Sequence, residues 1–337
     1  MISTLFFGCS KSGNTDNSNF FTSDVYITGY EDGQFGQIAK MWKNGVETSL
    51  TSGSNSSGGY SIFVSGVDVY VAGYQNNGSY DVAKIWKNGI ATNLNPGPKN
   101  ARAYSLCISG TDVYATGYES NGTHFVAEVW KNGVETPLTS GVNDAIGNFI
   151  YVSGGDVYAT GYESNGTYVV AKVWKNGVGT SLTSGLNNAQ GGSIYVSGSD
   201  IYVGGYESNG SYNVAKVWKN GIATALSDGT TDASVESIYI SGTDVYAAGA
   251  VWGLNSSGLP IKWGKIWKNG IEIFPPDINN ESAIIAVSVS GNDVYATGYE
   301  AIQSYPYYEY ATLWKNGIAY HMTDGTHGAG GISLFVK

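Results

Sequence analysis

The stretch Asp156-Val-Tyr-Ala-Thr-Gly-Tyr-Glu-Ser-Asn-Gly-Thr-Tyr-Val-Val-Ala-Lys-Val-Trp-Lys-Asn-Gly177 contains two motifs that recur along the whole chain. Trp-Lys-Asn-Gly occurs seven times, and each copy is preceded by Asp-Val-Tyr, with Ile for Val once. The first five copies are spaced 44 residues apart, and the last two steps are 49 and 47 residues. Seven units of this length indicate a repeat architecture rather than two ordinary domains. The motif tryptophans are Trp42, Trp86, Trp130, Trp174, Trp218, Trp267 and Trp314.

One unit predicts four short strands. In the fifth unit they cover 193–197, 200–207, 212–219 and 222–226. Gly198-Ser199, Ser208 to Ser211 and Asn220-Gly221 separate them, and Gly and Asn accept the positive φ that tight hairpin turns demand. No segment of useful length has a helical period. The segment after the fourth strand varies in every unit.

Four antiparallel strands repeated seven times predict an all-β fold, a seven-bladed β-propeller. The first unit begins at its second strand (Asp24-Val-Tyr26), and the chain ends in a first-strand sequence, Ile332-Ser-Leu-Phe-Val-Lys337. We therefore expect the C-terminal strand to complete the N-terminal blade and close the ring, which removes exposed sheet edges. Residues 20–337 are expected to form this single domain, preceded by a polar tether within 1–19.

The repeated charges and tryptophans are expected to serve the scaffold. A two-residue turn at Asn165-Gly166 would place Tyr158 opposite Val173 and Asp156 opposite Lys175, so each blade would hold one Asp–Lys cross-strand pair. The seven tryptophans are interpreted as packing between blades. Cys107 is expected to be a small buried core residue.

In strand layout the units resemble kelch-type repeats of the β-propeller superfamily. The Val-Tyr-Ala-Thr-Gly-Tyr segment (157–162 in the fourth unit) occupies the place of the kelch Tyr-x-x-Gly-Gly strand, and a Trp follows later in the unit. The Gly-His and Trp-Asp signature of WD40 repeats is absent from the sequence. This resemblance covers residues 20–337 and implies a fold without implying an activity.

The amino-acid composition limits the classes of partner that we expect this protein to bind. Charged residues make up 13% of the chain, against a usual value of about 25%. The formal net charge is −10, and Arg102 is the only arginine. This balance argues against nucleic acid and suits a glycan or an extracellular protein. The cysteine and histidine spacings suggest no metal site, we expect no cofactor, and we expect a monomer.

The N-terminal sequence resembles a bacterial lipoprotein signal. Leu5-Phe6-Phe7-Gly8-Cys9 is an apolar stretch ending in Gly-Cys, and the polar residues 10–19 follow it. The resemblance implies export to the cell envelope or the exterior, with a lipid on Cys9 as the only membrane attachment. Another export signal, or a chance match, is the alternative.

Candidate ligand-binding residues are those that differ between units. Arg102 and Tyr104, with the corresponding Tyr60, lie at the start of innermost strands, which places them near the mouth of the channel. The two longest loops between second and third strands, in the sixth and seventh units, contribute further aromatic residues suited to sugar rings or a protein epitope. These are Trp252, Trp263, Tyr307 and Tyr308.

Three functions remain open. The first is an exported, surface-anchored binding or scaffold module that recognises a glycan or a protein through this loop face. The second is a propeller-fold lyase or hydrolase acting on carbohydrate, for which Glu236 and Glu281 could form an acid pair at the channel mouth. The third is a purely structural repeat protein.

Overall fold

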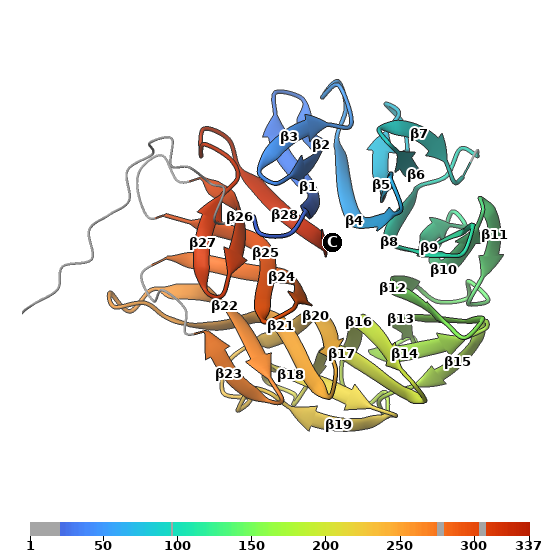
Figure 1. Cartoon of the computed structure of the whole chain (residues 1–337). Coiled ribbons are helices and arrows are strands. Elements are labelled where there is room, and N and C mark those ends of the chain that lie inside the picture. Colours follow the sequence, from blue (N-terminus) through green and yellow to red (C-terminus); the bar gives the residue numbers. More distant parts are fainter. Residues whose placement is uncertain (1–20, 96, 275–279, 303–307) are drawn as a thin grey trace, which may run out of the picture.

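The computed structural model describes residues 21–95, 97–274, 280–302 and 308–337. They form seven four-stranded antiparallel sheets arranged as blades in a ring, and no helix occurs among these residues. Figure 1 shows the blades arranged around a common axis. The predicted all-β, seven-bladed propeller is confirmed.

Each blade has an inner, a second, a third and an outer strand, and blades 1 to 7 are numbered from the N-terminus. The inner strands are β28 (Ala329–Val336), β4 (Ser57–Ser65), β8 (Ala101–Ser109), β12 (Ala145–Ser153), β16 (Ala189–Ser197), β20 (Ala233–Ser241) and β24 (Glu281–Ser290). The second strands are β1 (Val25–Gly33), β5 (Asp68–Asn76), β9 (Asp112–Ser120), β13 (Asp156–Ser164), β17 (Asp200–Ser208), β21 (Asp244–Leu254) and β25 (Asp293–Ala301). The third strands are β2 (Gly36–Lys43), β6 (Asp81–Lys87), β10 (Phe125–Lys131), β14 (Val169–Lys175), β18 (Asn213–Lys219), β22 (Pro260–Lys268) and β26 (Glu309–Lys315). The outer strands are β3 (Val46–Ser49), β7 (Ile90–Asn93), β11 (Val134–Pro137), β15 (Val178–Ser181), β19 (Ile222–Ala225), β23 (Ile271–Phe274) and β27 (Ile318–His321).

Blade 1 closes the ring with both ends of the described chain. Its inner strand, β28, pairs with β1 from Val25–Val336 to Glu31–Ala329. Beyond the strands, the Asp24 N–H donates to the Lys337 carbonyl, and the Lys337 N–H donates to the Asp24 carbonyl. The predicted shared blade is therefore confirmed.

The hairpin turns follow from residues that tolerate positive φ. In the third-to-outer turn of blade 4, Asn176 has φ 50° and Gly177 has φ 83°, as a type I′ turn requires. All seven Asn-Gly pairs of the repeat motif share this conformation. The two-residue turn between inner and second strands also forms as predicted, with Ser197 opposite Asp200.

The predicted register between second and third strands is wrong by two residues. Tyr158 lies opposite Lys175 rather than Val173, because the loop after Ser164 has four residues instead of two. The side chain of Asn165 stabilises this wider loop, since its Oδ1 accepts hydrogen bonds from the Thr167 and Tyr168 N–H groups. The Asp–Lys pair forms diagonally all the same, with Asp156 Oδ2 lying 2.7 Å from Lys175 Nζ. All seven blades contain this ion pair.

The repeated tryptophans pack between blades, as predicted. Trp130 of blade 3 is fully buried in a cluster that includes Ala72 and Ala83 of blade 2. Trp174 of blade 4 packs in the same way on Ala127 of blade 3. Each such side chain fills the space that widens between neighbouring blades away from the axis. Burying a large aromatic side chain stabilises the fold by about 1.5–3 kcal/mol.

Within the described part of the chain, no helix is long and apolar enough to cross a membrane.

Candidate functional site

Every inner strand carries a β-bulge at the same point of its repeat. In blade 2, for example, Gly59 and Ser61 are paired with consecutive residues of β5, and Tyr60 between them is left unpaired. A bulge re-aims the extra side chain. The seven bulge residues are of five different types, unlike the repeated scaffold positions around them. They are Tyr60, Tyr104, Asn148, Gly192, Glu236, Ile285 and Ile332.

These seven residues surround the channel mouth on the face where the loops between second and third strands lie, which we call the upper face. All seven blades line a hollow of about 210 Å³ there. Tyr60 and Tyr104 are part of its wall, where the sequence predicted them. Their ring centroids are 5.1 Å apart.

Arg102 joins the same group of side chains, but its charge is already paired. Its Nε and one terminal nitrogen donate to Asp81 Oδ2 over 2.8 and 2.6 Å, and Nη1 donates to the Tyr60 hydroxyl over 3.2 Å. The guanidinium also stacks over the ring of Tyr74, 4.0 Å from its centroid. Burial raises the pKa of the Tyr60 phenol in spite of the nearby arginine, so the phenol stays neutral. Arg102 therefore connects blades 2 and 3 and orients Tyr60.

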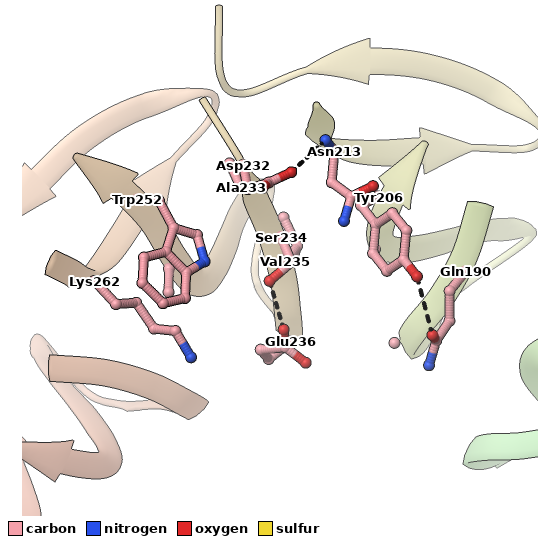
Figure 2. Close-up of a pocket in the computed structure, with 13 residues that line it drawn as sticks. Gln190, Tyr206, Asn213, Asp232, Ala233, Ser234, Val235, Glu236, Trp252 and Lys262 are labelled. Atoms are coloured by element: carbon pink, nitrogen blue, oxygen red, sulfur yellow. Dashed lines mark hydrogen bonds between the residues drawn. The ribbon is translucent and has the colours of Figure 1, made fainter. Parts of the chain in front are cut away.

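A second hollow, of about 190 Å³, opens on the upper face between blades 5 and 6. Figure 2 shows its walls: Gln190 and Tyr206 on one side, Glu236 in the middle, and Trp252 with Lys262 on the other side. We call it the blade 5/6 pocket. It exists because blade 6 has Ala250 where the six other blades have a tyrosine near the end of the second strand. Those tyrosines are Tyr30, Tyr74, Tyr118, Tyr162, Tyr206 and Tyr299.

The polar groups of this pocket are positioned by one another. The Tyr206 hydroxyl donates to Gln190 Oε1 over 3.4 Å, and the Ser234 hydroxyl donates to Glu236 Oε1 over 2.6 Å. Burial, followed by the charge of Glu236, raises the pKa of Tyr206, so its hydroxyl remains a donor. Figure 2 draws these bonds as dashed lines.

The opposite wall combines an aromatic face with a cation. Lys262 Nζ lies 5.3 Å from the centroid of the Trp252 ring. The pocket thus offers a carboxylate, an ammonium group, an amide, a phenol and an indole within one small volume.

The structure separates the two tryptophans that the sequence placed together. The expected long loop of blade 6 is largely an extension of the β21–β22 hairpin, closed by a turn over Asn255 to Leu259. Trp252 lies opposite Lys262, and Trp263 lies opposite Val251. Because side chains alternate along a strand, Trp252 and Trp263 point to opposite faces of the hairpin.

The candidates of blade 7 are less well placed. Tyr308 is exposed just before β26, and Tyr307 lies outside the described residues, as does Cys9.

The two carboxylates considered as an acid pair have different neighbours. Glu236 lines both hollows, whereas the charge of Glu281 affects the carboxyl group of Glu309. Burial, followed by the charges of Glu281 and Asp32, raises the pKa of Glu309. In the described ranges, no three His, Cys, Asp or Glu side chains are grouped so as to hold a metal ion.

Several lining residues were missed from the sequence, namely Gln190, Tyr206, Asp232, Ala250 and Lys262. The signal was present in the second-strand motif. Its Gly-Tyr ending becomes Gly249-Ala250 in blade 6 alone. The missing tyrosine side chain at Ala250 was less conspicuous than the extra Trp252 two positions later.

Comparison with known proteins adds support for the fold only. No family model matches the chain, and no curated protein matches it. Among solved structures it is similar to the crystal structure of TolB from Acinetobacter baumannii, with a TM-score of 0.50 and 13% sequence identity. The match covers 74% of this chain and 62% of that one, so the chain corresponds to less than two thirds of the TolB structure.

Proposed function

We propose that this protein is a binding module that holds a sugar residue of a glycan in the blade 5/6 pocket. The observation that carries the proposal is the break in the second-strand motif at Ala250, which blade 6 alone shows. That break replaces a tyrosine with open space beside Trp252, Glu236 and Lys262.

The chemistry of the pocket suits a neutral, polyhydroxylated ligand. The indole of Trp252 offers a flat apolar face for the C–H side of a sugar ring. The groups of Glu236, Gln190 and Lys262 offer acceptors and donors for its hydroxyls. The volume of about 190 Å³ is below the roughly 300–1,000 Å³ of pockets for drug-sized ligands, which favours one sugar residue at the end of a chain.

Glycan-array binding followed by calorimetry tests the proposal. Ala250→Tyr restores the residue of the other blades and fills the pocket, so binding should fall at least about tenfold while the melting temperature stays the same or rises. Trp252→Ala should also weaken binding about fivefold, since a ring contact contributes of the order of 1 kcal/mol. Tyr168→Ala is the matched control, because Tyr168 is 38% exposed against 42% for Trp252 and lies on blade 4. Glycan binding that survived Ala250→Tyr would refute this site.

Measurements on variants of this protein also distinguish a binding module from an enzyme. Turnover of the bound glycan that is lost in Glu236→Gln would favour a lyase or hydrolase over a binding module. Binding of an extracellular protein alone, with no glycan bound at any concentration, would favour a protein partner on the upper face.

Export and anchoring through Cys9 form a separate part of the proposal, supported by the sequence 5–9. A mass spectrum of the native protein should show a diacylglycerol on an N-terminal Cys9. An intact Met1 in the protein recovered from cells would refute it.

A further inference from the structure

The blade 5/6 pocket continues into the central channel. Gln190, Gly192 and Glu236 line both the pocket and the channel mouth. Gly192 is the bulge residue of blade 5, and it brings no side chain to the ring of bulge residues. A Cβ on Gly192 would lie 2.8 Å from the Val235 carbonyl oxygen, so the blade 6 backbone packs directly against this residue. The two hollows meet at the three shared residues, and a ligand in the pocket therefore lies beside the channel mouth.

The channel continues below the mouth as a third hollow of about 290 Å³, which we call the lower channel. Phe149, Ser237, Ala286 and Ser333 line both of these hollows. Three positions after each bulge, five blades direct an aromatic side chain to this region. These are Phe63, Tyr151, Tyr195, Tyr239 and Phe335. They pack on one another, with centroids 5.0 Å apart for Phe63–Phe335 and 4.8 Å for Tyr151–Tyr195.

Many polar atoms in the wall of the lower channel are already bonded to protein. The hydroxyl of Ser61 accepts a hydrogen bond from the backbone N–H of Leu106 in the next blade over 3.1 Å. Four other blades repeat this inter-blade bond, through Ser105, Ser193, Ser237 and Ser333. The channel therefore presents mainly apolar surface to an occupant, and apolar cavities favour apolar ligands over water.

Cys107 and Ser288 interrupt the aromatic ring. Cys107 stands where five blades have Phe or Tyr, and its side chain is buried in the channel wall. Burial raises the pKa of its thiol, so it is a weak nucleophile that reacts slowly. The rate at which this thiol reacts with a labelling reagent should therefore depend on whether a ligand occupies the lower channel.

We infer that the ligand is amphiphilic: its sugar sits in the blade 5/6 pocket and an alkyl or aryl substituent extends past Gln190 and Glu236 into the channel. This inference rests on the proposed function for the sugar end, but the apolar site can be tested without it. The five residues from bulge to turn in each inner strand span about 16 Å, which is long enough for an octyl chain.

The test uses n-alkyl glucosides with methyl, butyl, hexyl and octyl chains below their micellar concentrations. With the wild-type protein, affinity by calorimetry should rise up to about fourfold per added methylene, as expected for a buried chain. Cys107→Tyr restores the residue type of the other blades and narrows the lower channel. It should flatten this rise for the longer chains and leave methyl glucoside unaffected. Trp252→Ala should weaken all members of the series by a similar factor.

Labelling of Cys107 gives an independent readout. In a Cys9→Ser protein Cys107 is the only thiol, and its rate of reaction with iodoacetamide should fall severalfold with octyl glucoside and with 1-octanol. Methyl glucoside should leave the rate unchanged. Protection by 1-octanol without any glucoside binding would support the apolar channel while counting against the proposed sugar site. Equal affinities along the series, together with no protection by octyl glucoside or 1-octanol, would overturn the inference and leave the proposed function to its own test.

Discussion

Asn176 Nδ2 donates a hydrogen bond to Asp156 Oδ1 over 2.8 Å, and Asn176 Oδ1 accepts one from the Val157 N–H over 2.9 Å. The turn residue of Trp-Lys-Asn-Gly therefore binds the start of the neighbouring second strand. Every blade repeats both bonds. The corresponding pairs are Asn44–Asp24, Asn88–Asp68, Asn132–Asp112, Asn220–Asp200, Asn269–Asp244 and Asn316–Asp293.

Substitution of Asn176 should separate its role as a turn residue with positive φ from the role of its side chain in hydrogen bonding. Asn176→Gly keeps the positive φ and removes both side-chain bonds, so we expect the free energy of unfolding to fall by about 1–2 kcal/mol. Lys175→Met is the control, since it removes the exposed ion pair with Asp156 and the contact of the ammonium group with the Tyr158 ring, and it should lower the stability less than Asn176→Gly does. Urea denaturation measures both. A glycine variant as stable as the wild type would show that the turn conformation alone explains the motif.

The seven repeated aspartates should make the fold sensitive to acid. Hydrogen bonds and ion pairs with the neighbouring Asn and Lys lower the pKa of each carboxyl below the ordinary aspartate value of 3.8. A lowered folded-state pKa means that the unfolded chain binds more protons, so this stabilisation is present above pH 4 and is lost as the pH falls below it. The melting temperature should drop steeply between pH 4 and pH 2. A flat profile over that range would contradict the assignment.

Glu128 should give the opposite pH dependence. Blades 1, 2, 4, 5 and 6 have a lysine at its position, but blade 3 has this buried carboxyl, and within the described residues its Oε2 accepts no hydrogen bond. Burial, followed by the charge of Glu135, raises its pKa to about 9. The folded chain then binds the extra proton, so this stability is complete below about pH 4.5 and declines as the pH rises towards 9.

Glu128→Gln removes that titration. It should raise the free energy of unfolding at pH 8 by about 1–3 kcal/mol and change it little at pH 4.5. Glu128→Lys should also stabilise the protein at pH 8, because Glu119 and Glu135 would then surround a cation, as Glu163 lies beside Lys172 in blade 4. Equal stability of wild type and Glu128→Gln at both pH values would contradict the raised pKa.

Removal of the closing strand tests the ring. Deletion of Ile332–Lys337 takes away most of β28 and leaves β1 with an unpaired edge. We expect a large fall in melting temperature and a tendency to aggregate. Ser333→Ala, which removes one inter-blade hydrogen bond to Ile62, is a mild control. An unchanged melting temperature of the truncated protein would refute closure through blade 1.

The sequence predicted the blades well because each turn is marked by residues with few alternatives. Asn-Gly with positive φ at both positions is readable without a structure. Asn165-Gly166 has the same letters as Asn176-Gly177 but forms a four-residue loop, because the Asn165 side chain bonds two later N–H groups. Whether an Asn-Gly pair forms a two-residue turn or part of a four-residue loop depends on local hydrogen bonds that the residue types do not reveal.

The candidate site was predicted in part. Tyr60, Arg102 and Tyr104 meet because they begin neighbouring inner strands, and strand order follows from the repeat. Trp252 and Trp263 separate because a hairpin extends where a loop was expected. The change from tyrosine to Ala250 can be read in the sequence, but the space that it leaves is a property of three-dimensional packing.

The backbone pair of Asp24 and Lys337 has a consequence for how such a chain can be rearranged. It corresponds to the pair of Ser65 and Asp68, which encloses the two-residue turn Gly66-Val67 in blade 2. A two-residue bridge from Lys337 to Asp24 would complete the circle, and a new opening could then be cut at any of the six other inner-strand turns. Circular permutants of this kind should fold to the same ring, so a gene for it could start in any blade.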